Sequence, residues 1–207
     1  MSGPLPAEVA IAARRAGVTL LALLCAASGL GGCRGIPYAE PSVEGEYGTA
    51  LKNATRRASL IEGLETRAFV HLVYVTPELA ALQADRLSGF RAEPPAEAAA
   101  RRDRARAEVA APTFFAIVFT PERNWNDWES KKSSWRIALD TPAGQSVPVS
   151  VQRFERPFGV ELAKTYPFVD DFHVAYKLQF PAGVITQPPH LTVAGALGKM
   201  EFSWKED

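Results

Sequence analysis

Three residues in one four-residue segment could do acid–base or metal chemistry. Asp170, Asp171 and His173 place two carboxylates beside an imidazole. A carboxylate can orient an imidazole that acts as a general base, whereas a metal ion would need at least three converging ligands. The other two histidines, His71 and His190, have no spacing relation to this segment. We therefore keep two interpretations of this segment open. It is either the site of a hydrolase or a metal-binding protein, which is our alternative function, or a simple turn that leads into a strand.

Two tryptophans in a polar stretch could bind a ligand. Trp125 and Trp128 lie in the sequence NWNDWE, residues 124–129. Aromatic side chains on a loop stack on sugar rings or anchor a protein partner. The same rings can also fold back and cap a hydrophobic core. Both interpretations stay open: a glycan or partner site at Trp125 and Trp128, or packing.

A cluster of arginines could bind an acidic partner. The cluster consists of Arg101, Arg102, Arg104 and Arg106. Guanidinium groups bind phosphates and carboxylates through paired hydrogen bonds. The surrounding residues are mostly Ala, Arg and Glu, which is also typical of an exposed helix stabilised by its propensity and by opposite charges four residues apart. We expect any docking of a protein partner to involve residues 77–111, around this cluster.

The sequence contains none of three short motifs that mark common catalytic sites. It lacks the serine elbow G-x-S-x-G, the phosphate loop G-x-x-x-x-G-K-[ST] and the zinc motif H-E-x-x-H. Carboxylate pairs for glycoside hydrolysis are positioned by the fold and leave no spacing to find in a sequence. We expect a non-catalytic protein without a cofactor.

The N-terminal segment has the composition of an export signal. Arg14 and Arg15 precede an apolar run over residues 16–29, which is shorter than the about 20 residues that span a bilayer. The run is followed by Leu30-Gly31-Gly32-Cys33. A basic segment, a short apolar run and small residues at a cleavage point are typical of a secretory signal.

Residues 14–33 resemble the signal of bacterial lipoproteins, whose lipobox is an aliphatic residue, two small residues and a cysteine. The resemblance implies cleavage between Gly32 and Cys33 and lipid on the Cys33 thiol. Two or more acyl chains would hold the mature chain at a membrane without spanning it. Arg34 follows, where lipoproteins retained at the inner membrane of Gram-negative bacteria often have Asp. The resemblance therefore favours the outer membrane, facing the periplasm.

Cysteine usage and charge narrow the expected partners. Cys25 lies in the segment that cleavage would remove, so the mature chain would have no disulfide and would depend on its core for stability. The whole chain has 23 basic and 23 acidic residues; residues 1–32 contain two arginines and one glutamate, which leaves 21 and 22, a formal charge of −1. We expect no nucleic-acid partner. The expected partners are a membrane, through the lipid, and an envelope protein or a glycan.

The first elements after the signal are predicted from spacing and composition. Residues 33–48 are rich in Pro and Gly and predict an extended tether, and residues 49–207 are long enough for one domain. Apolar residues at three- and four-residue spacing predict a helix over residues 47–62. Residues 66–75 are apolar on both faces, which predicts a central strand. Residues 77–111 predict two helices inserted between strands.

Residues 113–204 are predicted to form strands and turns. Apolar patterns indicate strands over residues 113–120, 134–140, 147–154, 158–162, 172–180, 191–194 and 199–204. Several of these segments keep one polar face, which indicates antiparallel pairing. The sequence therefore predicts a mainly β fold. We expect an antiparallel β-sandwich, preferably immunoglobulin-like, with an N-terminal helix and a helical-hairpin insertion.

Overall fold

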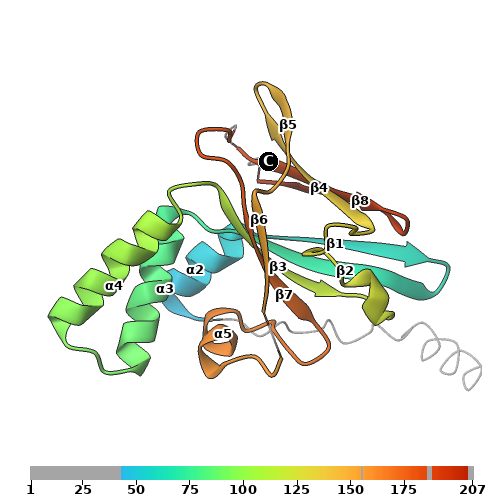
Figure 1. The fold of residues 1–207 in the computed structure, drawn as a ribbon. Helices are drawn as coiled ribbons and strands as arrows, with labels where there is room; N and C mark the ends of the chain where they lie inside the picture. The colour runs from blue at the N-terminus through green and yellow to red at the C-terminus, as the bar shows by residue number, and fades with distance from the viewer. Residues whose placement is uncertain (1–42, 155, 186–187, 205–207) are drawn as a thin grey trace, which may run out of the picture. The chain divides into compact units, whose positions relative to one another are not determined.

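The computed structural model describes residues 43–154, 156–185 and 188–204. These residues form two antiparallel sheets and four α-helices (Figure 1). The predicted mainly β class with two antiparallel sheets is therefore confirmed. Predictions for residues 1–42, which include the signal, Cys33 and most of the tether, lie outside the described residues. Among the described residues, no helix is both long and apolar enough to cross a bilayer.

The described part of the chain begins with a helix that turns directly into a strand. Helix α2 (Gly45–Ala54) ends where Thr55 adopts an extended backbone, with φ −94° and ψ 134°. Strand β1 (Thr55–Glu62) follows, so the helix predicted over residues 47–62 is wrong in its second half. Helical spacing at Ala58 is coincidental there. Ala58 and Leu60 are partly buried and alternate with exposed neighbours, which is the period of a strand.

Five strands form the first sheet, in the order β1-β2-β3-β7-β6. The strands after β1 are β2 (Glu65–Tyr74), β3 (Thr113–Phe119), β6 (Ser150–Phe154) and β7 (Val174–Gln179). Three strands that are consecutive in sequence therefore pair side by side, whereas an immunoglobulin domain places its third strand in the other sheet. The strand order is not the immunoglobulin one.

Four strands form the second sheet, in the order β5-β4-β8-β9. They are β4 (Trp135–Thr141), β5 (Gly144–Ser146), β8 (His190–Gly195) and β9 (Gly198–Ser203). One core lies between the two sheets. It includes Leu72 and Tyr176 from the first sheet and Leu139, Leu191 and Phe202 from the second. This shared core makes the pair of sheets a sandwich.

A second core lies on the other face of the first sheet, under the helices. Val73 of β2 and Phe115 of β3 pack there against Leu51 of α2 and Leu79 of helix α3 (Pro77–Phe90). Strands β2 and β3 are therefore covered on both faces, which explains why residues 68–74 of β2 and 114–119 of β3 are apolar except for His71.

Helices α3 and α4 (Pro95–Glu108) lie between β2 and β3 in sequence and side by side in space (Figure 1). Thr76 caps α3, because its Oγ1 accepts a hydrogen bond from the Leu79 amide at 3.2 Å. Proline stands in the first turn of both helices, where the missing amide hydrogen removes no helical bond.

Two segments predicted as strands differ in the structure. Residues 158–162 were predicted to be extended, but helix α5 (Val160–Thr165) occupies this region. A short apolar alternation cannot separate a strand from one helical turn. Strand β6 begins at Ser150, later than the predicted residue 147, and Val147 and Val149 before it are exposed. A single 3₁₀ turn, η1 (Arg123–Trp125), precedes β4.

Candidate functional site

A cleft of about 300 Å³ lies between the helices α3 and α4 and the outer face of the first sheet. Its floor is apolar and includes buried Val75, Val109 and Phe115. Ala80 and Ala84 of α3 line the same space. Because alanine carries a single methyl group, this side of α3 leaves room that larger side chains would fill. The volume is at the lower end of those found for small-molecule sites.

Tyr166 and Gln83 supply the polar groups nearest to the apolar floor. The Tyr166 ring stacks on Phe115 with a centroid distance of 4.1 Å and nearly parallel planes. Its phenolic oxygen accepts a hydrogen bond from Nε2 of Gln83 at 3.0 Å. Burial raises the pKa of Tyr166 well above its usual range. The phenol is therefore neutral and acts as a hydrogen-bond donor and acceptor, not as a base.

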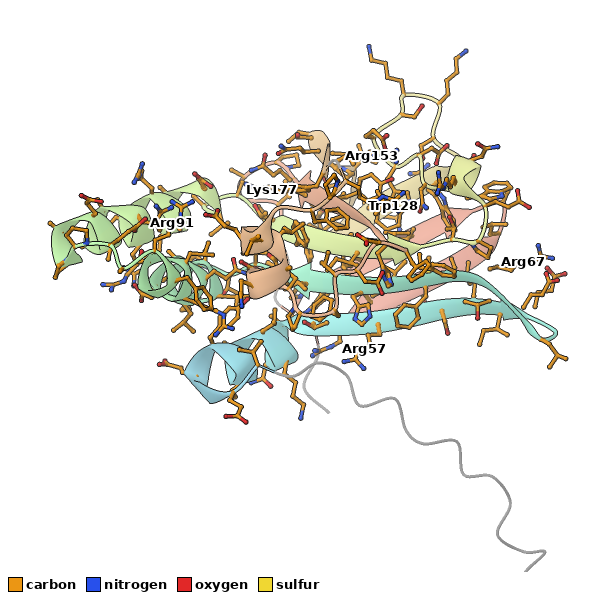
Figure 2. All side chains as sticks on the ribbon, turned by 90° about the horizontal axis from the view of Figure 1, so that it is seen from below. Arg57, Arg67, Arg91, Trp128, Arg153 and Lys177 are labelled. Atoms are coloured by element: carbon orange, nitrogen blue, oxygen red, sulfur yellow. The ribbon has the colours of Figure 1, made fainter. Side chains whose placement is uncertain are left out.

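The rim of the cleft is mainly basic. Arg101 and Arg104 of α4 and Lys177 of β7 line it, together with the carboxylate of Glu108. Nζ of Lys177 lies 3.9 Å from Oε2 of Glu108, which is beyond hydrogen-bond distance. Nε of Arg104 donates to the Ala100 carbonyl at 3.3 Å, and Arg104 has no carboxylate partner among the described residues. Figure 2 shows Lys177 on the side of the sheet toward the helices.

Three of the four predicted docking arginines are paired with carboxylates. Nε of Arg101 donates to Glu93 at 2.8 Å, and Nε of Arg102 donates to Asp85 at 2.8 Å. Arg106 lies 3.6 Å from Asp103 in the same helix. The bonds of Arg101 and Arg102 fasten α4 to α3 and its following loop, so these two arginines stabilise the hairpin. Arg104 is the arginine of this cluster whose charge is not neutralised by a carboxylate of the described residues.

Asp170 and His173 meet, as their spacing suggested. Nδ1 of His173 lies 2.5 Å from Oδ1 of Asp170. The backbone carbonyl of Asp171, and not its carboxylate, accepts a hydrogen bond from Arg156. The structure also brings His71 of β2 close, with ring centroids of His71 and His173 6.3 Å apart. The sequence does not predict that His71 and His173 lie close together, because β2 and β7 are brought near each other only by their pairing with β3 in the sheet.

His71 is enclosed by aromatic rings. Its side chain is only 4% exposed and stacks on Phe168 with a centroid distance of 4.5 Å. Nδ1 of His71 has no hydrogen-bond partner among the described residues. Burial, followed by the charges of Arg57 and His173, lowers the pKa of His71 to about 3. Within the described residues, no three His, Cys, Asp or Glu side chains gather in a way that could hold a metal ion.

The two predicted ligand-binding tryptophans have different environments. Trp128, labelled in Figure 2, is 3% exposed and belongs to the core between the sheets. Its ring stacks on that of Tyr176 with a centroid distance of 5.4 Å. It is therefore a packing residue. Trp125 is partly exposed and lines a second recess of about 310 Å³ with Arg67 and Leu197. Its carbonyl oxygen accepts a hydrogen bond from the Trp135 indole at 2.7 Å.

The fold and the cleft together define a two-sheet β-sandwich with a helical layer on one sheet and a small amphipathic cleft under that layer. No family model matches the chain, and it matches neither a curated protein nor a solved structure. Sequence reasoning missed the cleft residues Gln83, Tyr166 and Lys177, which belong to no motif. The one available signal was the repeated alanine on one side of α3.

Proposed function

We propose that the chain is a lipid-anchored protein of a bacterial cell envelope with a non-catalytic binding role, and that the cleft under α3 and α4 is its binding site. The anchor is supported by the sequence Leu30-Gly31-Gly32-Cys33 behind a basic and apolar segment. The resemblance to lipoproteins favours the outer membrane, with the domain facing the periplasm.

The observation that carries the binding role is the cleft itself. It combines a floor of buried apolar side chains with hydrogen-bonding groups at Gln83 and Tyr166 and with charged groups at the rim. Concave sites of this composition are the usual small-molecule sites of proteins. The buried phenol of Tyr166 supplies a hydrogen-bond donor and acceptor for a polar atom of a ligand.

One observation favours a second candidate, a hydrolase that uses Asp170 and His173. The 2.5 Å contact orients the imidazole in the way that a carboxylate orients a catalytic base. The rings that lie next to His173, however, are those of Phe119 and of His71, and the imidazole of His71 is only 4% exposed and therefore poorly accessible to a substrate. Hydrolysis of p-nitrophenyl acetate that His173→Asn abolishes, at unchanged stability, would favour this candidate.

Cell fractionation tests the anchor. The full chain is produced in a Gram-negative host with Cys33 intact or as Cys33→Ser. We expect the intact chain in the membrane fraction and the variant in the soluble fraction. If the intact chain is soluble, or if its mature N-terminus is not a lipid-modified Cys33 by mass spectrometry, the lipoprotein proposal is wrong.

An uncharged fluorescent dye tests the cleft. N-phenyl-1-naphthylamine is titrated into the purified Cys33→Ser chain, and the same titration is made with Ala105→Trp added. Ala105 of α4 lines the cleft, so an indole there should fill it and reduce dye fluorescence. The control is Ala99→Trp, at an exposed position of the same helix outside the cleft. Equal dye binding in the two tryptophan variants would overturn the cleft as the binding site.

A further inference from the structure

We propose that the ligand of this cleft is an amphiphilic monoanion, a molecule with an apolar body and a single carboxylate or phosphate-type charge that Arg104 and Lys177 bind. The inference rests on the proposed binding role and names its ligand class. It follows from three features of the cleft: the charge balance at the rim, the apolar floor and the volume.

The charge balance leaves one cation to be neutralised. Arg101 is already neutralised by the carboxylate of Glu93, which accepts from its Nε at 2.8 Å. The charges of Lys177 and Glu108 balance each other, although at 3.9 Å the pair is too long for a hydrogen bond. Arg104 has no carboxylate partner among the described residues. A ligand with one negative charge would therefore complete the rim, whereas a cationic ligand would face a net positive edge.

The apolar floor requires that most of the ligand be apolar. Val75, Val109 and Phe115 are buried in the protein interior at the base of the cleft, and the methyl groups of Ala80 and Ala84 form its wall. A fully polar anion such as free phosphate would leave this surface without a partner. Burial of apolar ligand atoms against it supplies the main driving force for binding.

The volume limits the size of the apolar body. About 300 Å³ corresponds to about ten water molecules at liquid density, so the buried part of the ligand has on the order of ten non-hydrogen atoms. A short unbranched acyl chain has this size. The Tyr166 hydroxyl, which accepts from Gln83 at 3.0 Å, lines the same space and can donate its own proton to a polar ligand atom.

Displacement of the bound dye distinguishes the classes of ligand. Decanoate, decanol and decyltrimethylammonium share a ten-carbon chain and differ in charge. We expect decanoate to displace N-phenyl-1-naphthylamine from the Cys33→Ser chain at a concentration about fivefold or more below that of decanol. The cationic amphiphile should be the weakest of the three.

Two variants assign the charge to its residues. Arg104→Gln should weaken displacement by decanoate about fivefold more than it weakens displacement by decanol. Lys177→Gln should weaken displacement of the dye by decanoate more than Arg104→Gln does, because it leaves the negative charge of Glu108 without a neighbouring cation at the rim. Arg106→Gln is the matched control on α4, since Arg106 pairs with Asp103 and lies outside the cleft; it should behave as the parent chain.

The outcomes separate this inference from the proposed function. If the three amphiphiles displace the dye equally, or if Arg104→Gln and Arg106→Gln behave alike, the monoanion class is overturned while the cleft remains a binding site. If the dye binding is insensitive to Ala105→Trp, the binding site itself is wrong. Displacement by inorganic phosphate at the same concentration as decanoate would show a phosphate site without a requirement for an apolar body, which also overturns the inference.

Discussion

The carboxylate of Glu93 lies between Arg101 and the hydroxyl of Ser88: Oε2 accepts from Nε of Arg101 at 2.8 Å and from Oγ of Ser88 at 2.8 Å. Glu93 stands in the loop between α3 and α4, Ser88 in α3 and Arg101 in α4. One side chain thus ties both helices to their connection. Arg101 also lines the cleft, so the same contact shapes the proposed binding site.

Removal of the Glu93 charge should loosen the hairpin in a pH-dependent way. Hydrogen bonds from Arg101 and Ser88 lower the pKa of Glu93 to about 2. A lowered carboxyl pKa stabilises the fold above the ordinary pKa of about 4.3, and this stability is lost as the pH falls toward 2. Glu93→Gln should therefore lower the melting temperature at pH 7 and reduce the loss of stability between pH 5 and pH 2.5.

Thermal unfolding followed by circular dichroism at several pH values measures this effect. Glu97→Gln is the matched control, because Glu97 is an exposed carboxylate in the first turn of α4. Between pH 5 and pH 2.5, Glu97→Gln should lose nearly as much stability as the parent chain does. Identical pH profiles for the parent chain and Glu93→Gln would contradict the role assigned to this carboxylate.

The two tryptophans of the polar stretch should differ in their contribution to stability. Trp128 is buried between the sheets and stacks on Tyr176, so Trp128→Ala should lower the free energy of unfolding by about 3–5 kcal/mol. Trp125 is partly exposed, and its contact with Trp135 uses its backbone carbonyl. Trp125→Ala should therefore cost less than about 1 kcal/mol. Urea denaturation of both variants measures the difference, and equal costs would contradict the assignment of Trp128 to the core.

The strands that were predictable from the sequence are those whose burial pattern is simple. Residues 114–119 are apolar throughout because β3 is covered on both faces, and Trp135, Ile137 and Leu139 of β4 belong to the core between the sheets while Arg136 is exposed on the other face. Residues 172–180 were predicted as one strand, but β7 begins only at Val174, and Phe172 before it is 75% exposed. Strand β1 was missed because it is only partly buried, and its weak pattern also fits helical spacing.

The cleft could not be predicted, because its residues meet only through sheet pairing and helix packing. Lys177 stands opposite Phe115 in the register of β7 and β3, more than sixty residues away along the chain. Tyr166 reaches Phe115 from the segment after α5, and Gln83 comes from α3. None of these residue types is rare, and no short spacing links them. The charged residues that the sequence did single out, in α4, are mostly paired within the hairpin.

Titration of His71 should make the protein less stable in mild acid. Burial lowers the pKa of His71 to about 3, so the folded state holds the imidazole neutral while the unfolded chain takes up a proton near pH 6.5. The groups that face His71 are Arg57, His173 and Asp170; the charges of Arg57 and His173 also lower the pKa of His71, whereas that of Asp170 raises it. Stability from this residue is complete above pH 6.5 and falls as the pH drops toward 3.

The expected loss is about 1–2 kcal/mol between pH 6.5 and pH 5.0. His71→Leu keeps an apolar side chain among the aromatic rings and removes the titrating group. Urea denaturation at both pH values measures the free energy of unfolding. Between pH 6.5 and pH 5.0, His71→Leu should lose about 1–2 kcal/mol less than the parent chain, whatever its absolute stability. The burial argument fails if the variant loses as much stability as the parent chain over this interval.

Two glycines should respond in opposite directions to an added methyl group. A Cβ atom at Gly195 of β8 would lie 2.6 Å from the Ser134 carbonyl oxygen and 2.8 Å from the buried Trp135 ring, and neither group can move freely. Gly195→Ala should therefore lower the free energy of unfolding by about 1–3 kcal/mol.

A Cβ atom at Gly89, near the end of α3, would meet no atom within 4 Å. Gly89→Ala should raise the free energy of unfolding by about 0.5–1 kcal/mol, because alanine loses less backbone freedom than glycine on folding. Urea denaturation of both variants measures the two effects. An unchanged stability of Gly195→Ala would contradict the close packing of Gly195 against Ser134 and Trp135.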